Sequence, residues 1–568
     1  MPPPVLSLPS SQAAASSETK LDSREKTQEN VESYTDSELN VPVSGHAKLR
    51  RTMKNRHIAM ISIGGVIGTG LFLGSANSLA AGGPVGLLLG YSIYGFARRD
   101  DFVSAASGWS YHHGGTLRRL GMVIYSGLDV LYVNMHSNAA GRKHISLDYE
   151  GYNWTLTLPT ELSAAAVLIN YWTHSAKYDA VWITIFLVVA ILINMLGARA
   201  YGEAEFAFAS IKVITITGLI ILGVVLDLGG GPNHDRIGFR YWKTPGPFAQ
   251  FDGIGGPKGR FLAWWAVMSQ AAFSFFGTEV VAIAAGEAKN PRRNIPKAIK
   301  RVYIRILLFY IGGVTIIGML VPYTNPDLNL SESDAAKSPF VIAMTTAGIK
   351  GLPSVINAAL LTSAWSAASS DLYTSSRALY GLALNGHAPK ICTAVSSWGL
   401  PYIAVAVNSS FGLFAYMGVS TGSGRVFTWL VNMTSISGLM SWFGIAVTYI
   451  QFHKGLKAKN MSRKDLPYTA PLQPFLAWYA AISCFVICFF SGSSVFMKGG
   501  WSTADFVTNY LPFITFPILY VGARFWRQSH FIDPKDMDFK SGLAEVEAAS
   551  YDEPPPRNWV ERFWGWLM

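Results

Sequence analysis

The stretch "ISIGGVIGTGLFLG", residues 61–74, decides how this chain is interpreted. It is apolar enough for the interior of a membrane, yet five of its residues are glycine. Each glycine costs up to about 1 kcal/mol relative to alanine inside a helix. The sequence therefore predicts a first membrane helix that is weakened at one place.

The composition excludes most soluble classes. The chain has 568 residues, of which 50% are hydrophobic and only 14% are charged. A soluble chain of this length would form several domains and carry more charge, so we predict an all-α polytopic membrane protein embedded in the lipid bilayer. The net charge of +11 lies in clusters beside apolar spans, which the positive-inside rule explains without nucleic acid.

Signals for catalysis are missing from the sequence. There is no nucleophile–base set, no P-loop and no cluster of metal ligands, and the three cysteines give no disulfide framework. We therefore expect no enzyme activity, no cofactor and no metal.

A membrane helix needs about 20 apolar residues, and eleven segments qualify. They are 58–80, 152–172, 180–197, 206–228, 262–285, 303–323, 353–383, 402–421, 427–452, 475–497 and 506–526.

Basic clusters set the orientation and show that one span is missing. Arg50 to Arg56 and Lys289 to Arg301 both belong on the cytosolic side, so an even number of spans must join them. Only five of the segments lie between them. Residues 82–95, "GGPVGLLLGYSIYG", start like a membrane helix, but 96–150 carry many charges, and each central charge costs about 2.5–3.5 kcal/mol.

Two interpretations of 96–150 remain open. The segment is either a real insertion that follows a re-entrant element, or the product of a faulty gene model or shifted reading frame that replaces the end of span two. We favour the second. The domain organisation is then a disordered cytosolic tail over 1–50, a transmembrane domain over 51–530 that includes the anomalous segment 96–150, and a second cytosolic tail over 531–568. Both tails are candidate sites for trafficking partners.

Several long motifs identify a family. "RHIAMISIGGVIGTGLFLGSANSLAAGGPVGLLLGYSIYG", "LPTELSAAAVLINYW", "FASIKVITITGLI", "FSFFGTEVVAIAAGEAKNPRRNIPKAI" and "SAASSDLYTSSRALYGLALNGHAPK" resemble the fungal amino-acid permeases, the yeast amino-acid transporter branch of the amino acid–polyamine–organocation superfamily. The resemblance covers about 50–95 and 151–535.

The resemblance implies a leucine-transporter-like inverted-repeat fold with twelve spans, in which span two is disrupted here. It also implies proton-coupled uptake of amino acids at the plasma membrane by alternating access, with the proton as coupling ion and both termini cytosolic.

The weakened first helix is then explained by discontinuous helices that bind substrate near the membrane midplane. A half-helix that starts near Leu71 points its N-terminal N–H groups at an anion. We expect Gly68, Thr69 and Gly70 to bind the α-carboxylate of an amino acid, and Ile67 to belong to the same substrate site. From composition alone, a glycine-packed helix pair is an equal alternative.

The corresponding break in the second repeat is expected in "FSFFGTEVV", residues 273–281. Free carbonyls around Phe275, Phe276, Gly277 and Thr278 would accept the substrate ammonium group, with Phe276 closing over the substrate side chain. Glu279 is a carboxylate inside an apolar span and therefore a pathway or gating group by default. Its alternative roles are a structural ion pair or a protonated, hydrogen-bonded acid.

Two further charges fall inside spans. Glu161 either lines the cavity or lies near the cytosolic end of its span. Lys212 is proposed as a constitutive cation and candidate proton site, because in proton-coupled members such a lysine replaces a bound cation between spans one and eight, and burial disfavours a charged ammonium. The alternative is that Lys212 snorkels to the interface. Hydroxyls of span eight offer further weak contacts, namely Ser366, Ser369 and Ser370.

The sequence does not name the substrate. Neutral amino acids, including proline, or a broad range of amino acids are the expected substrates. The alternatives are an amino-acid sensor with the same fold, which the ordinary length of the N-terminal tail disfavours, and a transport-inactive product caused by the disrupted span two.

Overall fold

The computed structural model describes 60, 67–97, 149–173, 175–277, 307–330, 338–384, 388–463, 472–527, 533–537 and 558–559. The chain divides into residues 1–48, which lie outside this described part, and 49–568, to which all that follows refers. The described residues form helices and connecting loops, with no strand among them. The predicted all-α class is therefore confirmed.

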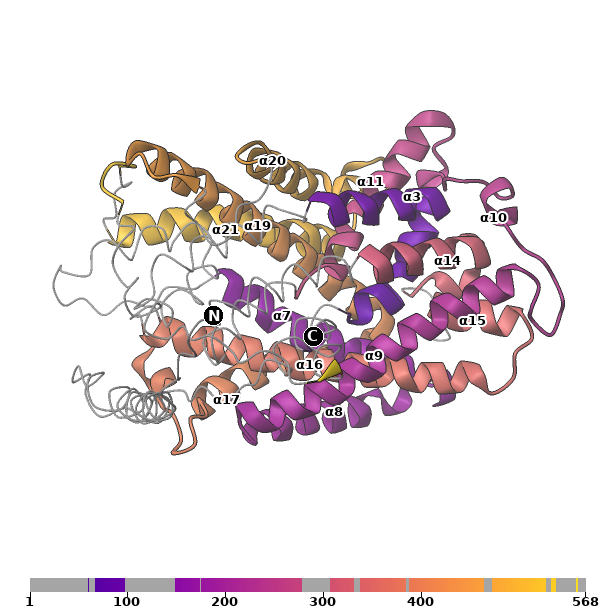
Figure 1. Cartoon of the computed structure of the whole chain (residues 1–568), viewed down its shortest axis with the longest axis horizontal. Helices are drawn as coiled ribbons and strands as arrows, with labels where there is room; N and C mark the ends of the chain where they lie inside the picture. The colour runs from indigo at the N-terminus through magenta and orange to yellow at the C-terminus, as the bar shows by residue number, and fades with distance from the viewer. Residues whose placement is uncertain are drawn as a thin grey trace, which may run out of the picture. The chain divides into compact units, whose positions relative to one another are not determined.

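Figure 1 shows the arrangement of the longer helices. They are α3 (Ser75–Ala97), α7 (Tyr149–Thr173), α8 (Asp179–Met195), α9 (Ala198–Asp227), α11 (Gly256–Ser274), α14 (Gly312–Leu320), α15 (Pro339–Thr346), α16 (Leu352–Leu384), α17 (Tyr402–Phe411), α19 (Ser423–Ala458), α20 (Phe475–Phe490) and α21 (Thr503–Arg527). Most of them overlap predicted spans, but α3 runs well past the predicted 58–80 and α15 lies in none of those spans. Two π-helical segments, Gly70–Gly74 and Leu307–Ile311, lead into α3 and α14.

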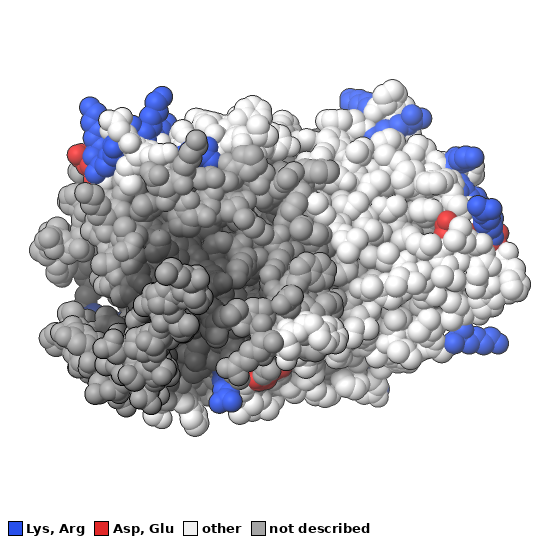
Figure 2. All heavy atoms as spheres, viewed as in Figure 1, with Lys and Arg blue, Asp and Glu red and all other residues white. Residues whose placement is uncertain are grey.

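The helices have the length and the surface of membrane spans. Among the described residues, four helical stretches are long and apolar enough to cross a bilayer by length and composition: Gly70–Tyr94, Ala198–Asp227, Tyr402–Thr421 and Ser423–Ala458. The first of them is interrupted at Gly83. On the face shown in Figure 2, most described Lys, Arg, Asp and Glu side chains lie toward opposite ends of the view, with a broad uncharged surface between them. An uncharged band of this kind is what lipid-facing helices require.

Helix α3 contains a reversal of the chain. At Gly83 the backbone leaves the helical region, with φ 72° and ψ 176°, and Pro84 follows at the start of the next turn. The hydroxyl of Tyr91 lies 3.5 Å from the carbonyl oxygen of Gly70, whereas one unbroken helix would separate these residues by about 30 Å. The chain therefore turns back at Gly83, and 84–97 form a second arm beside the first.

The second arm lies where the charge parity requires one more span. The described helices between the two basic clusters are now the two arms of α3, α7, α8, α9 and α11, which is an even number. The arm over 84–97 is helical, as the predicted start of a membrane helix requires. At 1.5 Å per residue the arm over 84–97 is about 20 Å long, short of the roughly 30 Å hydrocarbon core. The continuation over 98–148 lies outside the described residues, so the total of twelve spans and the disruption of span two stay predictions.

Substitution of Gly83 by alanine is expected to destabilise the protein. The added Cβ would lie 2.7 Å from the backbone nitrogen of Ala249, at a positive φ that costs alanine about 1–3 kcal/mol. Gly86→Ala is the matched control, because its Cβ meets no atom closer than 3.6 Å. Thermal unfolding in detergent should show a lower midpoint for Gly83→Ala alone. Equal midpoints for the two variants would argue against the reversal.

Helix packing brings distant segments together. α11 packs along both arms of α3, and the two lie side by side in Figure 1. α16 packs against α7, α8 and α9, while α19 packs against α7, α11, α20 and α21. The start of α3 and the end of α11 consequently meet in the interior.

Candidate transport site

The first helix break lies where the glycines predicted it. Ile67 and Gly68 are bent, helical geometry begins at Thr69, and the π-helix Gly70–Gly74 continues into α3. All residues of that π-helix are buried. The first N–H groups of a helix have no partner within it, so a buried helix start at this point presents N–H donors to an interior ligand.

The second break lies at the end of α11. The helix stops at Ser274, Phe275 and Phe276 form a turn, and Gly277 has φ 92°. The turn is closed by N–H groups of Phe275 and Phe276, which donate to the carbonyls of Ala272 (3.0 Å) and Phe273 (3.2 Å). Glycine permits the positive φ at low cost. The predicted site residues Thr278 and Glu279 lie outside the described residues.

The two breaks touch each other. A Cβ placed on Gly70 would lie 2.6 Å from the Cα of Ser274, so only glycine permits this approach. Tyr91, on the second arm of α3, shares a 2.7 Å hydrogen bond with the Ser274 hydroxyl. Tyr310 donates to the Ser274 carbonyl at 2.7 Å.

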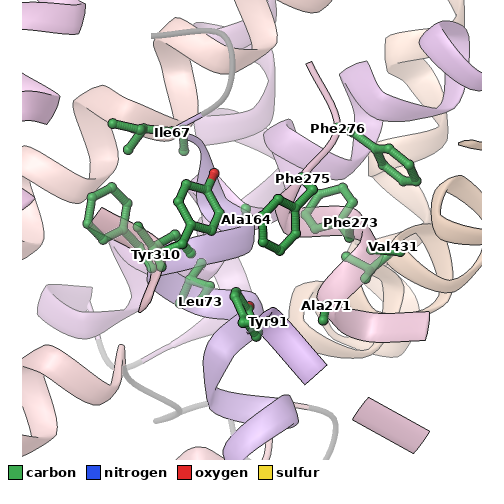
Figure 3. Close-up of a cluster of buried hydrophobic side chains, with 14 of the residues drawn as sticks. Ile67, Leu73, Tyr91, Ala164, Ala271, Phe273, Phe275, Phe276, Tyr310 and Val431 are labelled. Atoms are coloured by element: carbon green, nitrogen blue, oxygen red, sulfur yellow. The ribbon is translucent and has the colours of Figure 1, made fainter. Parts of the chain in front are cut away.

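An aromatic cluster supports this meeting point. The ring of Phe275 lies against Tyr91 and Tyr310, with centroid separations of 5.7 Å and 4.9 Å. Figure 3 shows these rings between Ile67 and Phe276. Sequence analysis missed both tyrosines, because an aromatic residue in an apolar span gives no signal of its own.

Glu161 of α7 lies beside the first break. Its Oε1 would be 3.4 Å from a Cβ on Gly68, and its carboxyl group interacts with Thr69. Glu161 Oε2 and the Thr69 hydroxyl make no well-formed hydrogen bond within the described part of the chain. Glu161 is 4% exposed, which places it in the interior next to the predicted carboxylate site.

Lys212 of α9 is fully enclosed. Its side chain is 1% exposed, and Nζ lies 4.0 Å from Oε1 of Glu205, which is also 1% exposed. The alternative in which Lys212 snorkels to the interface is therefore wrong. It assumed a helix that starts near residue 206, but α9 begins at Ala198 and places Lys212 about four turns into the helix.

Helix α16 links the first break to Lys212. Ser363 donates to the carbonyl of Ile67 at 3.4 Å, and Ser366 donates to Oε2 of Glu205 at 2.8 Å. The Ser369 hydroxyl accepts a hydrogen bond from Asn194 at 3.2 Å. Ser366 thus bonds a carboxylate rather than its own backbone. Glu205 was missed because it lies one residue before the apolar segment that defined the predicted span.

Phe276 packs onto α19. Its ring lies 4.8 Å from that of Trp442, centroid to centroid, in an edge-on arrangement. A Cβ on Gly438 would come within 2.2 Å of the Phe276 ring, so the ring sits directly on that glycine. The predicted role of Phe276, closure over a substrate side chain, requires movement on or off this glycine surface.

Gly438→Ala is therefore expected to displace the Phe276 ring. We expect KM to rise about tenfold, equivalent to about 1.4 kcal/mol, for amino acids with large side chains, and less for glycine. Gly218→Ala, whose added Cβ meets no atom within 4 Å, should leave KM unchanged. The check is concentration-dependent uptake of labelled leucine and glycine. An equal rise in KM for both would show that the ring does not face the substrate side chain.

Solved structures of a manganese transporter have a similar fold. A manganese transporter from Eremococcus coleocola, in a Glu-to-Gln mutant form, superposes with a TM-score of 0.51 over 87% of this chain and 95% of its own, at 11% sequence identity. Another structure of the same transporter, with a bound bis-isothiourea compound, gives a TM-score of 0.50. At this identity the likeness shows the fold alone.

Curated relatives are permeases. The chain is 37% identical over 538 residues to the proline-specific permease of Emericella nidulans, covering 93% of this chain and 94% of the relative. It is 38% identical to the dicarboxylic amino acid permease of Saccharomyces cerevisiae, covering 87% and 80%, and 38% identical to the lysine-specific permease of the same yeast, covering 91% and 82%.

The family model for amino acid permeases matches residues 57–98 and 146–533 and leaves out 99–145. This match includes both helix breaks and Lys212. The chain is thus a multi-pass membrane protein, and it belongs to the amino acid permease family.

Proposed function

We propose that this chain moves amino acids into the cell across the plasma membrane, coupled to protons, by alternating access between the two sides. The single observation that carries the proposal is the meeting of two buried helix breaks at Gly70 and Ser274. Non-helical backbone inside a membrane is tolerated only where it is buried in protein or lines a cavity, and transporters of this architecture bind their substrates at such breaks.

The two breaks offer complementary groups to an amino acid. The helix start at Gly68, Thr69 and Gly70 supplies N–H donors and a positive dipole end for the α-carboxylate. The turn after α11, from Phe275 to Gly277, supplies carbonyl acceptors for the ammonium group. Ile67 adjoins the proposed carboxylate-binding part, and Thr278 adjoins the proposed ammonium-binding part.

We assign proton coupling to the buried charged residues. Lys212 of α9 is the proposed resident cation, and it faces α7 and α16. Its ammonium group would lose and regain a proton during the transport cycle. Glu161, beside Thr69, is the proposed carboxylate that couples the substrate site to Lys212. Glu279 is kept as a pathway or gating carboxylate.

Neutral amino acids, including proline, or a broad range are the proposed substrates. The relatives are named for proline, dicarboxylic amino acids and lysine, so family membership leaves the substrate open. The described polar side chains that contact the breaks are Ser274, Thr69, Glu161 and Ser363 and the hydroxyls of Tyr91 and Tyr310. None of these is a cation that could pair with an acidic side chain. Competition against uptake of labelled proline tests the proposal. Strong inhibition by aspartate and glutamate alone would contradict it.

A transport-inactive product or an amino-acid sensor is the second candidate. The omission of 99–145 from the family match favours it, because these residues stand where span two should end. Sequencing the transcript across the codons for 90–155 separates the two. An apolar span in the transcript restores an ordinary permease, whereas the charged segment as written favours a chain that does not transport.

A further inference from the structure

Buried polar groups continue beyond Lys212, along α8, α9 and α16, away from the two helix breaks. They are Asn194, Tyr201, Glu205, Ser370, Asp371, Tyr373 and Arg377, all of which are buried. None belongs to the proposed amino-acid site. Buried ionisable groups inside a membrane protein are costly and mark ion pathways. These seven residues, called the polar column, are therefore candidates for an ion pathway.

Glu205 is the member that faces Lys212. One of its oxygens, Oε2, accepts the 2.8 Å hydrogen bond from Ser366. The other, Oε1, lies 4.0 Å from the Lys212 Nζ and has no hydrogen-bond partner among the described residues. Ser366 thus fixes the carboxylate and leaves one oxygen directed at the ammonium.

Lys212 lies between carboxylates from three helices. It interacts with Glu205 on α9, with Glu161 on α7 and with Asp371 on α16. Glu161 is next to Thr69 and hence on the side of the substrate. Glu205 is two helical turns, about 10 Å, closer to the start of α9, and the proposed orientation puts that end in the cytosol.

An aromatic stack closes the polar column one turn beyond Glu205. The rings of Tyr201 and Tyr373 are parallel within 5°, with centroids 4.1 Å apart. The guanidinium of Arg377 lies 3.9 Å from the centre of the Tyr373 ring. The Tyr201 hydroxyl donates to Ser370 at 2.9 Å. Tyr201 lies one turn closer than Glu205 to the start of α9, and Tyr373 lies two turns beyond Ser366 toward the end of α16.

We propose that Glu205 receives the coupled proton from Lys212 and releases it to the cytosol when the stack of Tyr201 and Tyr373 opens. In the first step an N–H bond of the Lys212 ammonium breaks and an O–H bond forms at Glu205 Oε1, which leaves a neutral amine and a neutral acid. In the second step the acid gives its proton to cytosolic water. The inference rests on the proposed function, because it assigns the exit route of the same proton.

The test uses the full chain, purified and reconstituted in liposomes, and compares two transport modes of Glu205→Gln. Uptake of labelled proline driven by an inward proton gradient requires proton release in every cycle. Exchange of labelled external for unlabelled internal proline at equal pH does not. The inference predicts that Glu205→Gln loses proton-driven uptake about 100-fold and retains exchange. Glu203→Gln, an exposed carboxylate on the same helix, should retain both.

The outcomes separate this inference from the proposed function. If the unaltered chain shows exchange but no proton-driven uptake, the proposed coupling itself is wrong. If it shows both, and Glu205→Gln either retains uptake or loses both modes equally, Glu205 is not the proton acceptor. If Glu205→Gln does not fold, Glu205→Asp is the variant to test, because its shorter side chain places the carboxylate further from the Lys212 Nζ. The inference then predicts slowed uptake with unchanged exchange, and unchanged uptake would overturn it.

Discussion

Lys212→Ala is expected to abolish proton-driven uptake while the protein still folds and reaches the membrane. The Lys212 ammonium lies between carboxyl groups of α7, α9 and α16, with Glu205 Oε1 at 4.0 Å. Removal of the cation deletes the proposed proton site. Loss of a proton-transfer group typically costs 100-fold or more, about 10²–10⁴-fold.

The Lys212→Ala variant should still fold, because the carboxylates that surround Lys212 can become neutral. Without the ammonium, Glu205 and Glu161 can take up protons and avoid the cost of an unpaired buried charge. Lys258→Ala, at an exposed position in the first turn of α11, is the matched control and should transport normally. The measurement is uptake of labelled proline, normalised to the amount of protein at the cell surface. Normal proton-driven uptake by Lys212→Ala would exclude Lys212 as the coupling cation.

Gly70→Ala is expected to have the second largest effect, on substrate binding and on packing together. The added Cβ would meet the Ser274 backbone at 2.6 Å and its hydroxyl at 2.9 Å. Backbone cannot move aside as a flexible side chain does, so the two helix breaks must separate. Overpacking of this kind costs about 1–3 kcal/mol, and the separation would also misplace the Tyr91 hydroxyl that bridges Gly70 and Ser274.

Gly74→Ala provides a matched comparison on the same π-helical turn. Its Cβ would meet no atom closer than 3.9 Å, and alanine favours helix by up to about 1 kcal/mol over glycine. We expect Gly74→Ala to fold and transport at least as well as the unaltered chain, and Gly70→Ala to lose nearly all uptake and unfold at lower temperature. Uptake assays and thermal unfolding of the two variants should both show this difference. Similar behaviour of both variants would mean that the breaks are not in contact during transport.

Local signals in the sequence located the helix start and the helix end beside the proposed site. Glycines at 64–74 predicted a helix start near Leu71, and helical geometry begins at Thr69. Gly277 predicted a break in 273–281, and α11 ends at Ser274. Both predictions rest on backbone preferences of single residues, which do not depend on the rest of the fold. The same holds for the apolar spans, whose length is set by the bilayer.

Contacts between helices were not predictable in the same way. Tyr91 and Tyr310 bridge the breaks from two other segments, and nothing in their own surroundings distinguishes them from lipid-facing aromatics. Glu205 looked like the polar edge of a span because hydropathy marks where apolar residues begin, whereas α9 begins two turns earlier at Ala198. Its burial depends on the packing of α9 on α16, which brings Ser366 to it, whereas Lys212 lies two turns further along α9 itself.

One measurement tests the central claim most directly. The full chain is reconstituted in liposomes, and internal labelled proline is followed after an inward proton gradient is imposed, with leucine, lysine and aspartate measured in parallel. The account predicts accumulation above the external concentration for at least the neutral amino acids, which disappears when the gradient is dissipated. If the label equilibrates regardless of the gradient, or does not enter while still binding to the protein, the chain is not a proton-coupled amino-acid permease.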